Sequence, residues 1–152
     1  MNQNTRIAGL VLAGAILCAG AVAQGAPPAA GSVKISDKAG LCALSVPADW
    51  KVGPIKSLAD GPGGAKAAVS SSTASRSLAE VKPLAEQMMV PTRTFEDSSS
   101  RLWYAYAGNR EDETNWYVAV PTRGGVCVAR VSFKDASAEG SARKIALSLA
   151  PG

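Results

Sequence analysis

The sequence predicts an α+β domain, with an antiparallel sheet of about five to six strands and two helices packed against it. Residues 100–133 hold aromatic and β-branched residues in three short runs separated by polar, Gly- and Pro-containing connections, a pattern typical of a strand meander. Residues 78–89 and 136–149 place apolar residues at helical spacing. The order of strands, helix, meander and helix favours an arrangement in which both helices pack on one face of the sheet.

The first 23 residues have the pattern of a secretory signal peptide. A short polar stretch containing Arg6 precedes an apolar run over residues 7–23, which ends in the small-x-small sequence Ala-Val-Ala. An uncleaved anchor helix is the alternative, because the run is near the lower limit of about 17 residues for crossing a bilayer. A lipoprotein signal is excluded, since Leu17 is not the small residue that would have to precede a modified Cys18.

Cleavage after Ala23 predicts a periplasmic or secreted protein with no membrane contact after processing. The loss of Arg6 lowers the number of basic side chains from 16 to 15 against 12 acidic ones, a net charge of +3. A charge this weak and scattered excludes an electrostatic nucleic-acid interface. Residues 24–32 are a flexible leader by composition, and residues 33–150 are expected to form a single α+β domain with one core.

Two cysteines remain in the mature chain, Cys42 and Cys127. An even number in an exported protein predicts one disulfide bond, with two separate buried thiols as the alternative. The bond would join the first strand of the domain to the last, so these strands would lie side by side or face each other. The closed loop is long, and in the chain-entropy account it would contribute up to about 4 to 5 kcal/mol of stability.

Before the first helix the chain is expected to be extended, apart from one loop. Strands are predicted at residues 32–36, 41–46, 50–52 and 66–71. Trp50 is expected to be a core residue at one end of the sheet. Residues 53–65 contain a Gly-rich segment that precedes Lys66, but they lack the spacing of a phosphate-binding loop, and we expect a surface loop there.

The first helix is expected to begin with a capping box formed by Ser77 and Glu80. Pro83 is the unfavourable residue, because it has no backbone donor for a helical hydrogen bond. Asp135 is expected to cap the second helix. Between the helices, strands are predicted at residues 92–96, 101–107, 114–120 and 126–133.

The sequence excludes several kinds of catalytic and metal site. It contains no histidine, which removes Ser-His-Asp catalysis, Cys-His catalysis and histidine-containing zinc sites. A disulfide would leave no free thiolate in the mature chain. Residues 111–113 form an acidic cluster without the oxygen spacing of a calcium loop, and we interpret it as a solvated turn. We therefore expect no catalytic residues, no metal, no cofactor and no enzymatic activity.

An interaction surface is predicted on whichever face of the meander the helices leave open. Aromatic and arginine side chains contribute most of the energy at protein interfaces, and the meander is rich in both. The alternative interpretation is that the same rings form an ordinary core. The candidate residues are Arg101, Trp103, Tyr104, Tyr106, Trp116, Tyr117, Arg123 and Arg130.

The sequence resembles PsbP/Mog1-type domains and small exported bacterial proteins that have no assigned activity. The resemblance spans residues 40–149. It rests on the segment Leu-Ser-Val-Pro-Ala-Asp-Trp at residues 44–50, the Gly-rich loop, a helix that begins Ser-Leu-Ala-Glu at residue 77, and the Trp/Tyr meander. It implies an α/β/α or α+β sandwich that serves as a non-enzymatic binding or assembly module, and it supplies no catalytic residues. The disulfide is not part of that general pattern.

The predicted function is that of a small exported binding or accessory domain, which contacts a protein or a cell-envelope partner. Two alternatives stay open. One is a small-ligand carrier with an aromatic-lined pocket, and the other is a hydrolase that uses carboxylates and a tyrosine. An exposed aromatic patch would favour the binding domain. A closed apolar cavity would favour the carrier, and two buried carboxylates in a cleft would favour the hydrolase.

Overall fold

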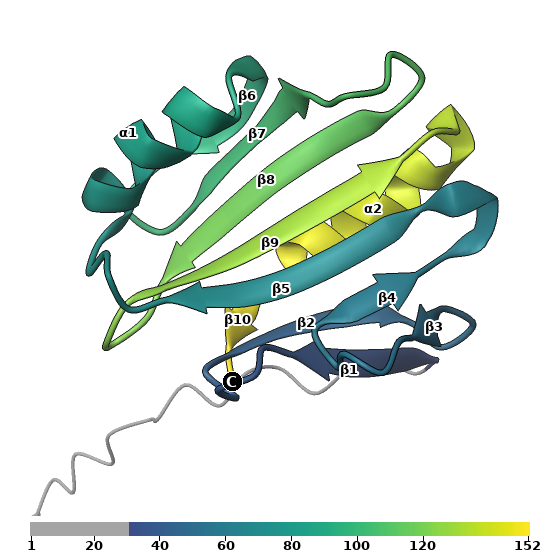
Figure 1. The fold of residues 1–152 in the computed structure, drawn as a ribbon, viewed down its shortest axis with the longest axis horizontal. Helices are drawn as coiled ribbons and strands as arrows, with labels where there is room; N and C mark the ends of the chain where they lie inside the picture. The colour runs from purple at the N-terminus through teal and green to yellow at the C-terminus, as the bar shows by residue number, and fades with distance from the viewer. Residues whose placement is uncertain (1–30) are drawn as a thin grey trace, which may run out of the picture.

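The fold is known from a computed structural model, which describes residues 31–152. The predicted signal peptide (residues 1–23) and all but the last two residues of the predicted leader lie outside the described residues, so both assignments stay predictions. Residues 31–152 form two antiparallel sheets and two α-helices (Figure 1). The predicted α+β fold, in which two helices pack against an antiparallel sheet, is confirmed, but the strands form sheets of seven and three rather than one sheet of about five to six.

Seven strands form the larger sheet, in the order β3-β4-β5-β9-β8-β7-β6, and every neighbouring pair is antiparallel. They are β3 (Lys51–Val52), β4 (Leu58–Asp60), β5 (Lys66–Ser72), β6 (Pro91–Asp97), β7 (Leu102–Ala107), β8 (Thr114–Pro121) and β9 (Val126–Phe133). The predicted meander is confirmed as β7, β8 and β9. Strand β4 lies inside the segment predicted to be a loop. The sequence did not predict this strand, because it has three residues, only Ala59 of them buried, and shows no alternation of apolar and polar residues.

The two edges of the larger sheet are short or irregular. Strand β6 is one edge, and its pairing with β7 shifts register twice, between Pro91 and Arg93 and between Thr94 and Glu96. Strand β3 is the other edge and has two residues. Neither edge therefore presents a long regular row of backbone donors and acceptors.

Three strands form the smaller sheet, in the order β1-β2-β10. They are β1 (Ser32–Ser36), β2 (Cys42–Pro47) and β10 (Ala150–Pro151). The sequence did not predict β10. This strand has only two residues, and in the sequence its Pro151 indicates the end of the second helix, because proline often follows a helix. Strand β10 is fixed by its pairing with β2 and by the bond from the Gly152 amide to the Leu41 carbonyl, 2.9 Å long.

The predicted disulfide joins the two sheets. Cys42 in β2 is bonded to Cys127 in β9, with the Cα atoms 5.4 Å apart and a sequence separation of 85. Both residues are fully buried. Of the two expected arrangements, side by side or facing, the strands take the second, because they belong to different sheets that pack face to face.

The two helices cover opposite faces of the larger sheet, which corrects the expectation that both lie on one face. Helix α1 (Leu78–Met88) packs its buried side chains against Leu102, Tyr104 and Tyr117. Helix α2 (Glu139–Leu147) packs on the other face, and Figure 1 shows it behind β9 and β5. The physical reason is visible in β8, where six consecutive residues are buried. A strand that is apolar on both faces needs a cover on both sides.

The predicted cap is confirmed for α1, whereas the cap predicted for the second helix belongs to a 3₁₀ turn that precedes α2. The Ser77 hydroxyl accepts a hydrogen bond from the Glu80 amide at 3.3 Å, and the Glu80 carboxylate accepts one from the Arg76 amide at 2.8 Å. Pro83 lies inside α1, which continues to Met88. The Asp135 carboxylate accepts from the Ser137 amide, and a short 3₁₀ turn (Ala136–Ala138) precedes α2. The second helix therefore begins later, and ends earlier, than residues 136–149.

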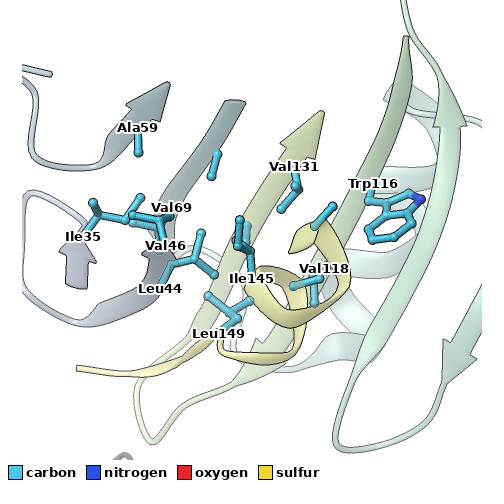
Figure 2. Packing of buried hydrophobic residues seen from close by; sticks show 14 of the residues in the cluster. Ile35, Leu44, Val46, Ala59, Val69, Trp116, Val118, Val131, Ile145 and Leu149 are labelled. Atoms are coloured by element: carbon cyan, nitrogen blue, oxygen red, sulfur yellow. The ribbon is translucent and has the colours of Figure 1, made fainter. Parts of the chain in front are cut away.

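The main core lies between the two sheets and α2. In Figure 2, Ile35, Leu44 and Val46 of the smaller sheet lie toward Val69 of β5 and Ile145 of α2. Trp50 is buried at one end of this core, as predicted, and its ring lies against the backbone of Gly61 so closely that a Cβ at Gly61 would overlap it. Within residues 31–152 no helix combines the length and apolar character needed to cross a membrane.

Candidate functional site

Four of the eight predicted surface residues lie in the cores rather than on the surface. Trp103 and Trp116 belong to the main core, and Tyr104 and Tyr117 lie beneath α1. All four have 4% or less of their surface exposed. The interpretation that these rings form an ordinary core therefore describes them correctly, because a helix or the smaller sheet covers each face of the meander where they lie.

Two of the predicted arginines lie apart from the rest. Arg101 is partly buried, and its guanidinium donates to the Leu147 carbonyl at the end of α2 over 3.4 Å and lies 3.8 Å from the Glu96 carboxylate. Arg123 is exposed in the turn between β8 and β9. Neither belongs to a surface shared with the buried aromatic rings.

The remaining two, Tyr106 and Arg130, are on the same face of the larger sheet, the one that carries α1. The pairing of the strands sets them in two neighbouring cross-strand rows. One row contains Leu58, Ala68, Arg130, Tyr117 and Tyr104. The next row contains Asp60, Lys66, Ser132, Asn115 and Tyr106. Helix α1 covers the end of the first row that holds Tyr117 and Tyr104, because these two residues belong to its core.

The uncovered ends of these rows form a groove of about 300 Å³, which we call the Tyr106–Arg130 groove. Its floor crosses five neighbouring strands of the larger sheet, which are β4, β5, β9, β8 and β7. It is lined by Leu58, Ala59, Asp60, Lys66, Ala67, Ala68, Tyr106, Asn115, Arg130, Val131 and Ser132. Leu58 exposes 43% of its surface, so an apolar side chain stands beside the charged ones.

Arg130 is the central charge of this groove. It makes no ion pair with any of residues 31–152, and its side chain is exposed. Burial raises the pKa of Tyr106, and the positive charge of Arg130 partly opposes that shift. Burial likewise raises the pKa of Tyr117 to about 12, again with Arg130 opposing. Both hydroxyls are therefore protonated at neutral pH and can donate hydrogen bonds.

Asn115 holds the polar end of the groove in place. Its side-chain amide donates to the Glu113 carbonyl at 3.3 Å, and only 8% of the residue is exposed. The backbone of Gly108 approaches this amide so closely that a Cβ there would overlap it. A side chain at position 108 would therefore displace the Asn115 amide, which forms one wall of the groove.

The groove combines donors with apolar surface and contains one carboxylate, Asp60. Arg130, Lys66 and the Tyr106 hydroxyl supply donors, and Leu58 supplies apolar contact. Such a set suits recognition of a polar or acidic group better than bond cleavage. No group of three or more potential metal ligands occurs within the described part of the chain.

In the acidic turn at residues 111–113, a hydrogen bond from the Lys134 ammonium group at 2.8 Å lowers the pKa of Asp112.

Of the residues that line the groove, the sequence predicted only Tyr106 and Arg130; those it missed include Leu58, Lys66 and Asn115. Leu58 lies inside the segment expected to be a loop, where no periodicity marks β4, and Lys66 follows that segment directly. Asn115 lies in the predicted strand, but its position on the same face as Tyr106 follows only from the register between β7 and β8. That register was the missing information.

No known family model matches the sequence, and no curated protein matches it either. Among solved structures, the chain is similar to the solution structure of cyanobacterial PsbP (CyanoP) from Synechocystis sp. PCC 6803, with a TM-score of 0.48 and 11% sequence identity. The similarity covers 90% of this chain and 99% of that chain. This similarity concerns the fold alone.

Proposed function

We propose that this chain is a small exported binding domain, and that a protein or cell-envelope partner docks in the Tyr106–Arg130 groove. The observation that carries the proposal is the unpaired guanidinium of Arg130. Tyr106 and Tyr117 lie on one side of Arg130, and the exposed side chain of Leu58 lies on the other. Arginine and tyrosine are enriched among the residues that dominate binding energy. A free cation next to apolar surface suits a partner that inserts an acidic or polar side chain.

The size of the groove favours a macromolecular partner. A volume of about 300 Å³ is at the lower end for small-molecule sites, which usually enclose roughly 300 to 1,000 Å³. It suits one or two inserted side chains. The proposal includes no catalysis, no nucleic acid and no membrane insertion.

Export is part of the proposal and is supported by the Cys42–Cys127 disulfide. Disulfides persist in oxidising compartments such as the bacterial periplasm or the extracellular space. We therefore place the partner in the periplasm or outside the cell. Measuring the N-terminal mass of the protein isolated from its host tests the predicted cleavage after Ala23.

Site-specific photo-cross-linking in the native envelope tests the groove. A benzophenone amino acid replaces Lys66, which lies at the rim of the groove, and in a matched control it replaces the exposed Lys34 of β1. We expect one defined adduct from position 66 and none of the same mass from position 34. The adduct should disappear with Arg130→Gln and persist with Arg76→Gln, which removes the same charge elsewhere. An adduct that does not respond to Arg130→Gln would overturn the proposal.

A second candidate function, small-ligand carriage, is favoured by a larger groove near the disulfide. Its volume is about 610 Å³, and its lining includes Leu41, Pro121, Val126 and Pro151. No aromatic side chain lines it, so it differs from the aromatic-lined pocket expected from the sequence. Native mass spectrometry of the mature protein tests this function. A bound molecule that is lost with Leu41→Trp would support carriage, and a ligand-free protein would contradict it.

A further inference from the structure

Four aromatic rings from four neighbouring strands form one cluster on the face of the larger sheet that carries α2. The ring centroids of Phe133 and Trp116 are 4.9 Å apart, those of Trp116 and Trp103 are 5.3 Å apart, and those of Trp103 and Phe95 are 4.8 Å apart. Phe95 is only partly buried, because it lies on the edge strand β6. The cluster therefore begins in the main core and reaches the surface at Phe95.

Two guanidinium groups from distant parts of the chain lie close to the Phe95 ring at this exposed end. The Cζ atom of Arg93, on β6, lies 5.0 Å from the centroid of Phe95. The Cζ atom of Arg143, on α2, lies 5.8 Å from the same centroid and 5.1 Å from that of Trp103. Guanidinium groups attracted to ring faces are held in position by the rings. Their N–H edges can then form two parallel hydrogen bonds with an oxyanion.

The charges around this pair leave a positive excess. Arg143 lies 3.5 Å from the Glu139 carboxylate one helical turn away, across an exposed surface where ion pairs are weak. Arg93 has no ion pair with any of residues 31–152, and its side chain is exposed. The nearby Arg101 and Glu96 pair with each other. Two guanidinium groups thus share one ring with a single carboxylate to balance them.

We propose that Arg93 and Arg143 bind an oxyanion of the phosphate type, with Phe95 as the apolar ring that supports both side chains. A tetrahedral phosphate offers several acceptor oxygens and up to two negative charges, so it can bridge two guanidinium groups, whereas a carboxylate is satisfied by one. The site lies on the opposite face of the sheet from the Tyr106–Arg130 groove. It therefore does not depend on the function proposed for that groove.

The indole of Trp103 provides a signal for the test. Its Nε1 atom is buried without a hydrogen-bond partner, and its ring contacts both Arg143 and Phe95. The mature, oxidised protein is titrated with sodium phosphate at constant ionic strength, and the indole N–H resonances are followed by NMR. We expect a saturable shift of the Trp103 resonance, and no shift when chloride replaces phosphate.

Matched variants show whether the two arginines carry the effect. Arg93→Gln and Arg143→Gln should each weaken phosphate binding by about tenfold, the loss of one charge-assisted contact. Arg93→Lys keeps the charge but loses the forked geometry, and it should weaken binding less than Arg93→Gln. Arg76→Gln removes an arginine outside the site and should change nothing. Far-UV circular dichroism confirms that each variant is folded.

The source of the phosphate is distinguished by vesicle sedimentation. Binding to phosphatidylglycerol vesicles but not to phosphatidylcholine vesicles, lost with Arg143→Gln, would assign the site to a lipid headgroup. A response to inorganic phosphate without vesicle binding would assign it to a soluble phosphate compound. No saturable response to either probe, or a response that Arg76→Gln weakens as much as Arg93→Gln does, would overturn the proposal.

Discussion

Cys42 and Cys127 join the central strand of each sheet, since β2 lies between β1 and β10 and β9 is the fourth of the seven strands in the larger sheet. The bond thus holds the two sheets together across the middle of the main core. We predict that the double substitution Cys42→Ala and Cys127→Ala lowers the free energy of unfolding by about 2 to 5 kcal/mol, because the unfolded chain is no longer cross-linked. Chemical denaturation of the variant, and of the parent with and without reductant, measures the loss. Equal stability of the oxidised and reduced parent would contradict the prediction.

Gly61→Ala should destabilise the end of the core that contains Trp50. The Cβ of an alanine would overlap the Trp50 ring, so the ring or the short turn after β4 would have to move. Overpacking of this kind costs about 1 to 3 kcal/mol. Thermal unfolding measures the loss, and near-UV circular dichroism reports the displaced indole. Gly124→Ala is the control, because a Cβ at Gly124 meets nothing within 4 Å. A similar loss in both variants would argue against the contact.

Asp37→Asn should destabilise the turn between β1 and β2. Burial by itself would raise the pKa of Asp37. Hydrogen bonds from the Ser71 hydroxyl at 2.6 Å and from the Cys42 amide at 2.8 Å outweigh burial and lower the pKa below its ordinary 3.8. The stabilisation by this carboxylate is therefore present above pH 3.8 and is lost as the pH falls through the lowered pKa.

Replacement by asparagine should cost about 1 to 3 kcal/mol at pH 7, because the amide cannot accept all of these bonds. Urea denaturation between pH 7 and pH 2 measures both effects. The variant should lose less stability than the parent on acidification, and parallel pH profiles would refute the role given to Asp37.

Tyr117 should make the domain sensitive to alkali. Its pKa is raised by burial from 10.0 to about 12, so the folded state holds the phenolic proton more tightly than the unfolded chain does. For a raised pKa the stabilisation is complete below pH 10 and is lost as the pH rises toward 12. The loss should reach on the order of 2 to 3 kcal/mol.

Tyr117→Phe tests this prediction, because phenylalanine keeps the ring and has no proton to lose. Denaturation between pH 8 and pH 12 should show a shallower alkaline decline in the variant. Arg130→Gln removes the charge that opposes the shift, so its decline should be steeper than that of the parent. An unchanged decline in Tyr117→Phe would mean that other groups govern the alkaline limit.

The sequence predicted the strands of the meander well, because their aromatic and β-branched runs are long and their turns are polar. It also predicted the cap of α1 and the disulfide, which follow from local pattern and residue count. It did not show that α1 and α2 lie on opposite faces, although β8 is apolar at Tyr117 and Ala119 as well as at Trp116 and Val118. The composition of β8, which is apolar on both faces, indicates the position of the helices better than the general preference for helices on one face of a sheet.

The candidate sites depend on long-range geometry that a linear pattern does not contain. Tyr104 and Tyr106 share a face by the period of two, yet Tyr104 is fully buried and Tyr106 only partly buried, because α1 covers only part of that face. Arg93 and Arg143 are 50 positions apart in the numbering, and both reach Phe95 only because α2 packs on the face of the larger sheet that holds the aromatic cluster. Residue type identified the candidates, and coverage by the helices decides which are accessible.

The irregular edges of the larger sheet limit how a partner can attach. A protein that binds by adding a strand needs a straight row of free backbone groups, but β6 is interrupted by two register shifts and β3 has two residues. The same irregularities hinder edge-to-edge polymerisation of the domain at the high local concentrations found in a confined compartment. The proposed partner would therefore contact side chains on a face of the larger sheet rather than one of its edges.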